Sequence, residues 1–143
     1  FLQANPDKTV KDVSIACYGI AFKPDIDDLR ESPALQIVES IMNNHVGDVL
    51  VIEPNVQKLP GLLSKAEKVS YESGWDAADI HVMLVDHKDF KKTDLKFRND
   101  KKYIDLRGVW GFLFKALSGN VGVFVPRKVW MGEKLDVAGL INE

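Results

Sequence analysis

The feature that most constrains the fold is a pair of short apolar segments, residues 13–20 and 48–54, on either side of a helical pattern. Each segment is too short for a core helix, and the second stops at a proline, so both are expected to be buried strands. Between them Ser32 and Pro33 form a helix-start signal. A serine side chain can accept a backbone N–H there, and proline at the first helical position loses no hydrogen bond. A strand, a helix and a second strand in this order favour a parallel sheet.

The stretch after Ser32 has the periodicity of an amphipathic helix. Its apolar positions recur every three or four residues, which places them along one face. The pattern closes at Gly47, and glycine commonly follows the last turn of a helix. We therefore expect a helix that starts at Pro33 and closes at Gly47, with these residues in its stripe: Leu35, Val38, Ile41, Met42 and His45.

The rest of the chain continues to alternate between helical and strand patterns. This alternation predicts an α/β fold with an open, mainly parallel, Rossmann-like sheet of four or five strands and helices on both faces. The further elements expected are a short helix at 59–66, a short strand at 69–71, a helix at 72–79 and strands at 80–85 and 103–106, with 90–95 ambiguous.

The 143 residues match the usual size of one domain. We expect residues 1–11, which are mostly polar, to be the end of an interdomain linker, and 12–110 to be the α/β domain. Residues 111–143 are expected to form a C-terminal extension of undetermined structure, with a helical pattern at 112–117 and an apolar run at 121–125. Because the first residue is Phe1 and no signal peptide is evident, we expect the chain to be part of a longer protein.

Charge and composition exclude several classes of function. With 19 basic and 21 acidic residues the net charge is −2, so we expect neither nucleic acid nor a membrane as a partner. No stretch reaches the roughly 20 apolar residues that span a bilayer. The single cysteine, Cys17, allows no internal disulfide or cysteine cluster for zinc, and cytoplasm is the expected compartment. Because Cys17 lies inside an apolar strand, we expect it in the core.

The segment between the first strand and the first helix, residues 21–32, carries the strongest sign of a binding site. Ligands of open α/β sheets bind outside the carboxyl ends of the strands, where this segment is expected. Lys23 and Arg30 offer positive charge and Phe22 offers a flat apolar surface, a set suited to a phosphate next to a base or sugar. The other interpretation is a solvated loop whose aspartates pair with its arginine. The residues alone leave both open.

Three aspartates of this loop, Asp25, Asp27 and Asp28, raise the possibility of a magnesium site. The spacing does not fit a calcium-binding loop, because the required glycine and glutamate are absent. We therefore expect no metal and predict that these carboxylates hold the loop and orient Arg30. Of the histidines, only His87 follows a strand near the expected ligand edge, so it is the one for which we expect a functional role.

A longer match then adds to this interpretation. Residues 19–34 fit the pattern G-x-A-F-K-P-x-x-D-D-x-R-x-S-P-A, with related segments at 51–54, 85–90 and 105–110. This chain thus resembles the C-terminal, UDP-binding domain of the UDP-glucose/GDP-mannose dehydrogenase family. Residues 83–87 and 108–110 resemble the branch that oxidises UDP-N-acetyl-mannosamine to its uronic acid.

The resemblance implies a role in an NAD-dependent UDP-sugar 6-dehydrogenase, which oxidises the C6 hydroxyl to a carboxylate with two NAD⁺. By motif position, Phe22, Lys23 and Arg107 are implied to bind the substrate and Arg30 the cofactor. No catalytic residue is implied in this chain, since the family's catalytic cysteine precedes this domain. The implied partners are the UDP-sugar, the N-terminal and central domains of the parent, and further copies in a homo-oligomer.

NAD is expected to be held mainly by the N-terminal domain, because this chain has no G-x-G-x-x-G after a strand. This chain alone is therefore expected to be inactive. Two other hypotheses stay open at this point. The first is a stand-alone nucleotide-binding or regulatory module. The second is a magnesium-dependent phosphoryl-transfer domain that uses the aspartates of the loop.

Overall fold

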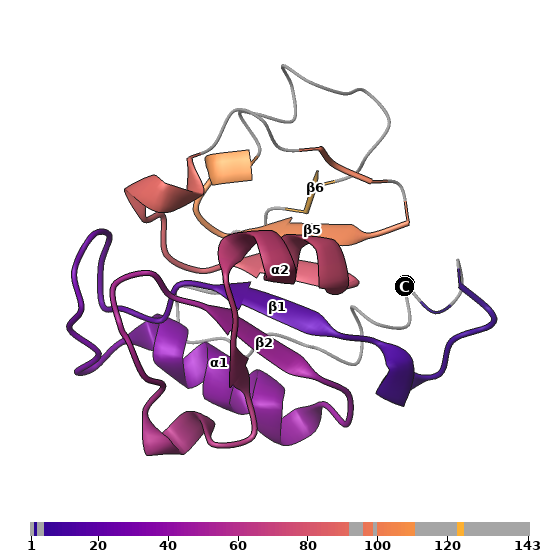
Figure 1. Ribbon diagram of the computed structural model, residues 1–143, viewed down its shortest axis with the longest axis horizontal. Coiled ribbons are helices and arrows are strands. Elements are labelled where there is room, and N and C mark those ends of the chain that lie inside the picture. The colour runs from indigo at the N-terminus through magenta and orange to yellow at the C-terminus, as the bar shows by residue number, and fades with distance from the viewer. Residues whose placement is uncertain (1, 3–4, 92–95, 99, 111–122, 125–143) are drawn as a thin grey trace.

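The computed structural model describes residues 2, 5–91, 96–98, 100–110 and 123–124. Their strands form one open sheet in the order β3-β2-β1-β4-β5-β6, and every neighbouring pair is parallel (Figure 1). The expected open parallel α/β class is confirmed. Five strands lie within residues 12–110, and β6 adds a sixth from the predicted extension. The strands are β1 Ile15–Tyr18, β2 Val49–Ile52, β3 Glu67–Lys68, β4 Ile80–Met83, β5 Lys102–Asp105 and β6 Val123–Phe124.

Helices cover both faces of the sheet, as predicted. Helix α1, Pro33–Asn44, packs on one face and α2, Tyr71–Ala77, on the other (Figure 1). Side chains along β1 alternate between these faces: Cys17 joins the α1 core and Tyr18 the α2 core. The four residues of β1, like those of β2 and β4, are all buried, which explains why these strands read as continuous apolar runs.

Local capping explains where the helices begin and where one strand prediction fails. Ser32 Oγ accepts the Leu35 N–H at 3.2 Å and starts α1 as expected. The strand expected at 69–71 is wrong: β3 ends at Lys68, because Ser70 Oγ accepts the Ser73 N–H at 3.1 Å and starts α2. Between β2 and β3, the helix expected at 59–66 is reduced to a 3-10 turn, Gly61–Leu63.

Helix α1 ends three residues before the expected glycine. The His45 ring donates from Nε2 to the Val13 carbonyl oxygen at 2.6 Å, which holds the helix end against the start of β1. Gly47 serves close packing, since a Cβ there would lie 2.3 Å from that same oxygen. The helix expected at 112–117 lies outside the described residues, and residues 90–95 are described only in part, with a 3-10 turn at Lys88–Phe90.

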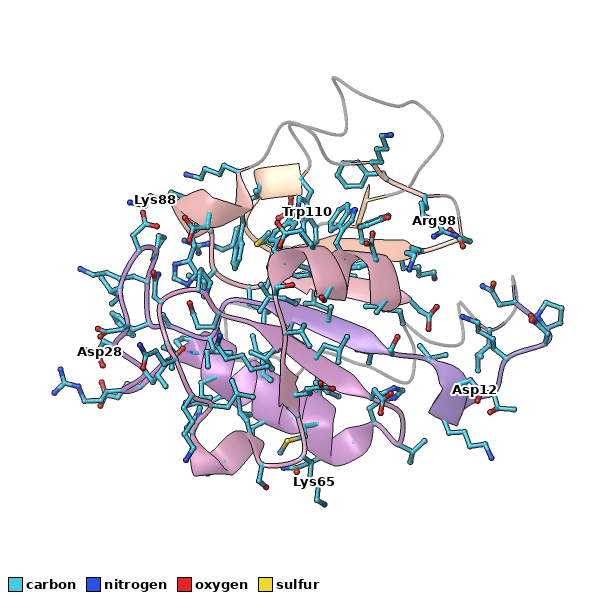
Figure 2. All side chains as sticks on the ribbon, in the orientation of Figure 1. Asp12, Asp28, Lys65, Lys88, Arg98 and Trp110 are labelled. Carbon is cyan, nitrogen blue, oxygen red and sulfur yellow. The ribbon has the colours of Figure 1, made fainter. Side chains whose placement is uncertain are left out.

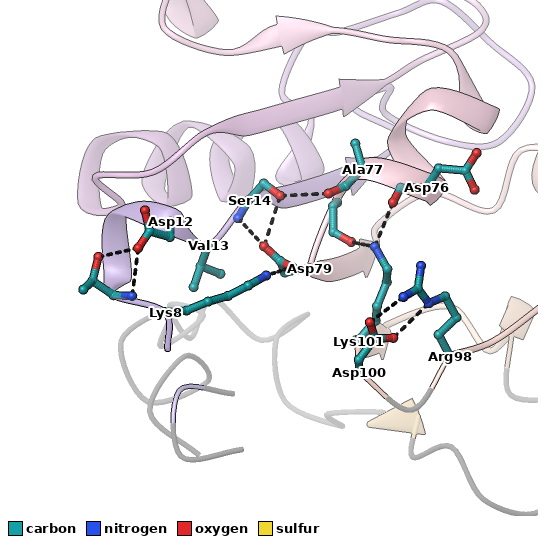
Figure 3. Close-up of polar contacts among 12 residues, drawn as sticks. Lys8, Asp12, Val13, Ser14, Asp76, Ala77, Asp79, Arg98, Asp100 and Lys101 are labelled. Atoms are coloured by element: carbon teal, nitrogen blue, oxygen red, sulfur yellow. Dashed lines mark hydrogen bonds and ion pairs between the residues drawn. The ribbon is translucent and has the colours of Figure 1, made fainter. Parts of the chain in front are cut away.

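The amino-terminal edge of the sheet is held together by its own polar contacts (Figure 3). Lys8 Nζ lies 2.6 Å from Asp79 Oδ1, and Asp79 also accepts the Ser14 backbone N–H at 3.0 Å. The Lys101 ammonium donates to the backbone oxygens of Asp76 and Ala78. The bonds to Asp79 tie the residues on either side of a 3-10 turn at Val10–Asp12 to the edge opposite the predicted binding loop, and the Lys101 bonds tie the residue before β5 to the end of α2.

Cys17 is fully buried, as expected of a core residue, and desolvation raises the pKa of its thiol to about 12. Trp110 is also fully buried and meets the Tyr18 ring edge to face at 5.0 Å. No helix in the described part of the chain is long and apolar enough to cross a membrane.

Candidate functional site

Three loops meet at the carboxyl edge of the sheet, where β1, β4 and β5 end. Figure 2 shows Asp28 and Lys88 at this end of the molecule, with Asp12 and Arg98 at the other. The chain leaves β1 through Gly19, whose φ of 93° favours glycine. A Cβ on Gly19 would lie 2.6 Å from the Val85 Cβ, so only glycine lets the first loop pass this close to the end of β4.

A buried carboxylate, Glu53, holds the start of the first loop. Its Oε1 accepts the backbone N–H groups of Ile20 at 3.0 Å and Ala21 at 3.1 Å, and its Oε2 accepts that of Asn55 at 3.0 Å. Burial acts to raise the pKa of Glu53, but hydrogen bonds from His87 and these backbone groups outweigh it and lower the pKa below its ordinary value. Glu53 is therefore an ionised acceptor beneath the loop.

His87 connects this carboxylate to the middle of the loop. Both side chains are about 1% exposed or less, and His87 Nε2 lies 2.9 Å from Glu53 Oε1. The Asp25 N–H points at His87 Nδ1 at 2.8 Å, so Nδ1 is the acceptor and Nε2 carries the proton donated to Glu53. In return the Lys88 N–H donates to Asp25 Oδ1 at 2.8 Å. Asp25 is thus pinned twice in a left-handed conformation, with φ of 63°.

The charged tip of the loop contains the expected pairing of aspartate with arginine. Asp28 accepts from Arg30 Nε at 3.1 Å and from Arg30 Nη2 at 2.9 Å, a bidentate geometry. Hydrogen bonds from Arg30 lower the pKa of Asp28 to about 2. The Arg30 side chain is 89% exposed and faces solvent. In the described part of the chain, no group of three or more His, Cys, Asp or Glu side chains could hold a metal ion.

The other three residues implied by the resemblance come together at one small cavity. Phe22 and Lys23 from the first loop and Arg107 from the loop after β5 line a hollow of about 50 Å³. Phe22 is 52% exposed, so its ring presents an apolar surface to solvent. Arg30 does not line this hollow. A space of this size holds only part of a nucleotide.

Backbone and side-chain bonds set the position of Arg107. The buried Asp105 carboxylate, at the end of β5, accepts the N–H groups of Arg107, Gly108 and Trp110 at 2.6 to 3.1 Å. The Arg107 Nε lies 2.9 Å from Asp86 Oδ1, in the loop after β4. The guanidinium is therefore oriented by a carboxylate while a third of its side chain stays exposed.

A second, larger cavity of about 470 Å³ lies toward α2. Glu53 and Phe90 line it together with Lys68, Ser70 and Tyr71, but none of the predicted site residues does. Glu53 thus lies between the larger cavity and the first loop.

Comparison with known proteins identifies the domain. Residues 16–115 match the model of the UDP binding domain of the UDP-glucose/GDP-mannose dehydrogenase family. The chain belongs to this family. The part of the chain that aligns with the curated members of this dehydrogenase family covers about a quarter of their length.

Two curated relatives and one solved structure illustrate the likeness. The chain is 46% identical to UDP-N-acetyl-D-mannosamine dehydrogenase of Yersinia pestis over 108 residues, which are 75% of this chain and 26% of that protein. It is 45% identical to NDP-N-acetyl-D-galactosaminuronic acid dehydrogenase of Ralstonia nicotianae over 100 residues, 70% of this chain and 24% of that one. The UDP-D-ManNAc dehydrogenase structure from Pyrococcus horikoshii matches with a TM-score of 0.56 and 29% identity, covering 76% and 24%.

Glu53 is the residue that the sequence analysis missed as part of the site. It stands directly after a buried strand and before a proline, the position at which a parallel strand delivers a side chain to the ligand edge. A carboxylate at that position is the signal that could have identified it. His87 was singled out, and the structure places it beneath the loop instead of on its surface.

Proposed function

We propose that this chain binds the nucleotide part of a UDP-sugar and serves as the C-terminal domain of an NAD-dependent UDP-sugar 6-dehydrogenase. The observation that carries the proposal is the convergence of Phe22, Lys23 and Arg107 on one hollow at the carboxyl edge of the sheet. Phe22 and Arg107 are 85 positions apart in sequence, and all three residues lie inside the segment that matches the UDP binding domain model. In this proposal the substrate is UDP-N-acetyl-D-mannosamine, which is oxidised at C6 to the uronic acid.

The chemistry of the three residues fits the parts of a UDP-sugar. The Lys23 ammonium supplies a compact cation for a phosphate or sugar oxygen, and Arg107 offers a planar fork that matches phosphate geometry. The exposed ring of Phe22 offers a surface for an apolar or planar group. Holding the nucleotide end accelerates a reaction at the sugar by orienting the reacting atom in another part of the enzyme.

The described residues do not fit a complete NAD site. The β1 to α1 connection is a long loop without the glycine-rich turn that lets a pyrophosphate approach a helix. At the start of α1, Pro33 has no N–H and the Leu35 N–H is already taken by Ser32. The exposed guanidinium of Arg30 fits a narrower role, as a cation that meets the cofactor when NAD is bound mainly by the rest of the enzyme.

Calorimetric titration of this chain with UDP tests the binding part of the proposal. We expect weak binding, because the hollow of about 50 Å³ contacts only part of the nucleotide. Uridine without phosphates is the matched control and is expected to bind more weakly still. A folded chain that takes up no UDP at millimolar concentration would overturn the proposal.

A chimera tests the enzymatic part. This chain replaces the matching quarter of the Yersinia pestis enzyme, to which it is 46% identical. We expect NAD⁺ reduction with UDP-N-acetyl-D-mannosamine, at two NADH per sugar oxidised, and none from this chain alone. A chimera that folds and assembles but oxidises no UDP-sugar contradicts the assignment. Its mass in solution, measured by light scattering, tests the homo-oligomer that we propose for the enzyme.

A further inference from the structure

Two anchors bracket the substrate-binding part of the first loop. Glu53 fixes the N–H groups of Ile20 and Ala21, and His87 fixes the N–H of Asp25. Only three residues, Phe22, Lys23 and Pro24, lie between the anchors. Two of these three are the residues proposed to touch the substrate.

The two anchors are a single unit, because the His87 Nε2–H donates to Glu53 at 2.9 Å. Both side chains are essentially inaccessible to solvent, so neither can itself touch a ligand at the hollow. The bond is strong because the acceptor is ionised and shielded from water. The unit also ties together three strand ends, since Glu53 follows β2, Ile20 follows β1 and His87 follows β4.

The bridge between the anchors is short and stiff. Pro24 restricts its own φ to about −65° and biases the preceding residue toward extended backbone. The Phe22 N–H adds a bond to the Asp28 carbonyl oxygen at 2.8 Å. An exposed lysine and an exposed aromatic ring are thereby presented on a backbone that does not need to be ordered when a ligand arrives, which lowers the free-energy cost of binding.

We propose that Glu53 and His87 are positioning residues, which hold Phe22 and Lys23 in the conformation that binds the nucleotide-sugar. This inference rests on the proposed function, and it extends it to two residues that the family resemblance did not assign. The decisive bond is the one from the Asp25 N–H to His87 Nδ1, because among the described residues it is the one link of the unit that reaches the far side of the bridge.

Two substitutions of His87 test its two hydrogen bonds separately, the one that Nδ1 accepts from Asp25 and the one that Nε2 donates to Glu53. Counted in bonds from Cβ, the side-chain oxygen of His87→Asn stands where Nδ1 stands, so it can still accept the Asp25 N–H, while its amide nitrogen lies one bond short of the position from which Nε2 donates to Glu53. The amide nitrogen of His87→Gln stands where Nε2 stands, so it can still donate to Glu53, while its oxygen lies one bond beyond the position from which Nδ1 accepts the Asp25 N–H. Both variants remove the ring, so the loss of ring packing is matched.

The affinity for UDP and the hydrogen exchange of the Asp25 amide are measured in both variants. We expect His87→Gln to speed exchange at Asp25 and to raise the Kd for UDP about three- to tenfold, the range of one lost hydrogen bond. His87→Asn keeps the acceptor for Asp25, so we expect its Kd for UDP and its exchange rate at Asp25 to stay within about twofold of wild type. Equal Kd values in the two variants, with exchange at Asp25 differing, would overturn the positioning role and leave the proposed function standing.

Other outcomes are equally informative. If wild-type chain binds no UDP, the proposed function fails and the positioning role fails with it. If both histidine variants unfold, Pro24→Gly tests the same idea from the bridge itself. Loosening this residue is expected to raise the Kd about two- to fivefold by the entropy that glycine adds. An unchanged Kd in a folded Pro24→Gly chain would show that a stiff bridge is not needed.

Discussion

The Tyr18 hydroxyl lies 2.7 Å from His81 Nδ1, and both side chains are fully buried on the face that α2 covers. The Tyr103 ring stacks on the His81 ring at 5.0 Å with an interplanar angle of 11°. Burial, and to a smaller extent the Lys101 charge, lower the pKa of His81 to about 3. His81 Nε2 finds no hydrogen-bond partner in the described part of the chain. The core therefore contains a neutral imidazole that resists protonation.

This imidazole makes stability depend on pH. The folded pKa of about 3 is below the ordinary value of 6.5, so the unfolded chain binds the extra proton between these values. The stability contributed by His81 is complete above pH 6.5 and is lost as pH falls toward 3. We expect the free energy of unfolding to be about 2 kcal/mol lower at pH 5 than at pH 7.5. Urea titrations at the two pH values measure it.

The double variant Tyr18→Phe with His81→Phe is the control for that experiment. It removes the titrating group together with its partner, so no buried polar atom is left unpaired by the change. We expect this variant to lose most of the difference in free energy of unfolding between pH 5 and pH 7.5. A difference of wild-type size in the double variant would assign the effect to other groups.

The hollow at the carboxyl edge predicts a large loss of affinity from single substitutions. Lys23→Ala or Arg107→Ala each removes one charge-assisted contact, which we expect to cost about 1.5 to 3 kcal/mol in UDP binding, roughly 10- to 150-fold in Kd. Calorimetry measures the change, and the KM of the chimera for UDP-sugar is expected to rise in parallel. Lys65→Ala is the matched control, because Lys65 is exposed and lies away from Asp28 and Lys88 in Figure 2. Unchanged Kd in both site variants would refute these assignments.

For Arg30 we expect the opposite result, an effect on the cofactor and none on UDP binding. Its side chain is 89% exposed, pairs with Asp28 and does not line the hollow, so Arg30→Ala is expected to leave both UDP affinity and the unfolding temperature unchanged. In the chimera we expect a higher KM for NAD⁺. Asp28→Asn weakens the bidentate hydrogen bonding to the Arg30 guanidinium, so we expect it to raise the KM for NAD⁺ as well, by a smaller factor. A fall in UDP affinity on Arg30→Ala would assign Arg30 to the substrate site.

Replacing Gly47 is expected to reduce stability for a reason unrelated to binding. Because a Cβ would meet the Val13 carbonyl oxygen at 2.3 Å, Gly47→Ala must displace backbone at the start of the sheet. We expect it to lower the free energy of unfolding by about 1 to 3 kcal/mol. Gly61→Ala is the comparison, since no atom lies within 4 Å of a Cβ at that position. Equal effects of the two substitutions would contradict the close approach.

The sequence predicted those parts of the fold that depend on neighbouring residues. Ser32 and Pro33 start α1 because capping is local, and the apolar runs became buried strands because they had to be covered on both faces. The boundary between β3 and α2 was misplaced because Val69 and Tyr71 fit a strand as well as a helix start, and Ser70 decided between them through one cap.

The candidate site also has parts that local sequence predicts and parts that it does not. Motifs predicted a shared site for Phe22, Lys23 and Arg107, and parallel topology brings their loops to one hollow at the carboxyl edge. The bond from His87 to Glu53 spans 34 residues, and no periodicity or motif in a single chain marks which histidine will face which carboxylate. Such pairs become visible only when the strands are in register.

The burial of Cys17 makes the chain suited to optical measurement. It is the only cysteine, and with a thiol pKa raised to about 12 in a fully buried position it reacts too slowly with maleimides to compete with an exposed thiol. A cysteine introduced at the exposed Asp27 can therefore carry a fluorophore without any native residue being removed to prevent double labelling. A dye at that position would report movements of the loop proposed to bind the nucleotide, and the same dye at the 75% exposed Val46 would serve as the silent reference.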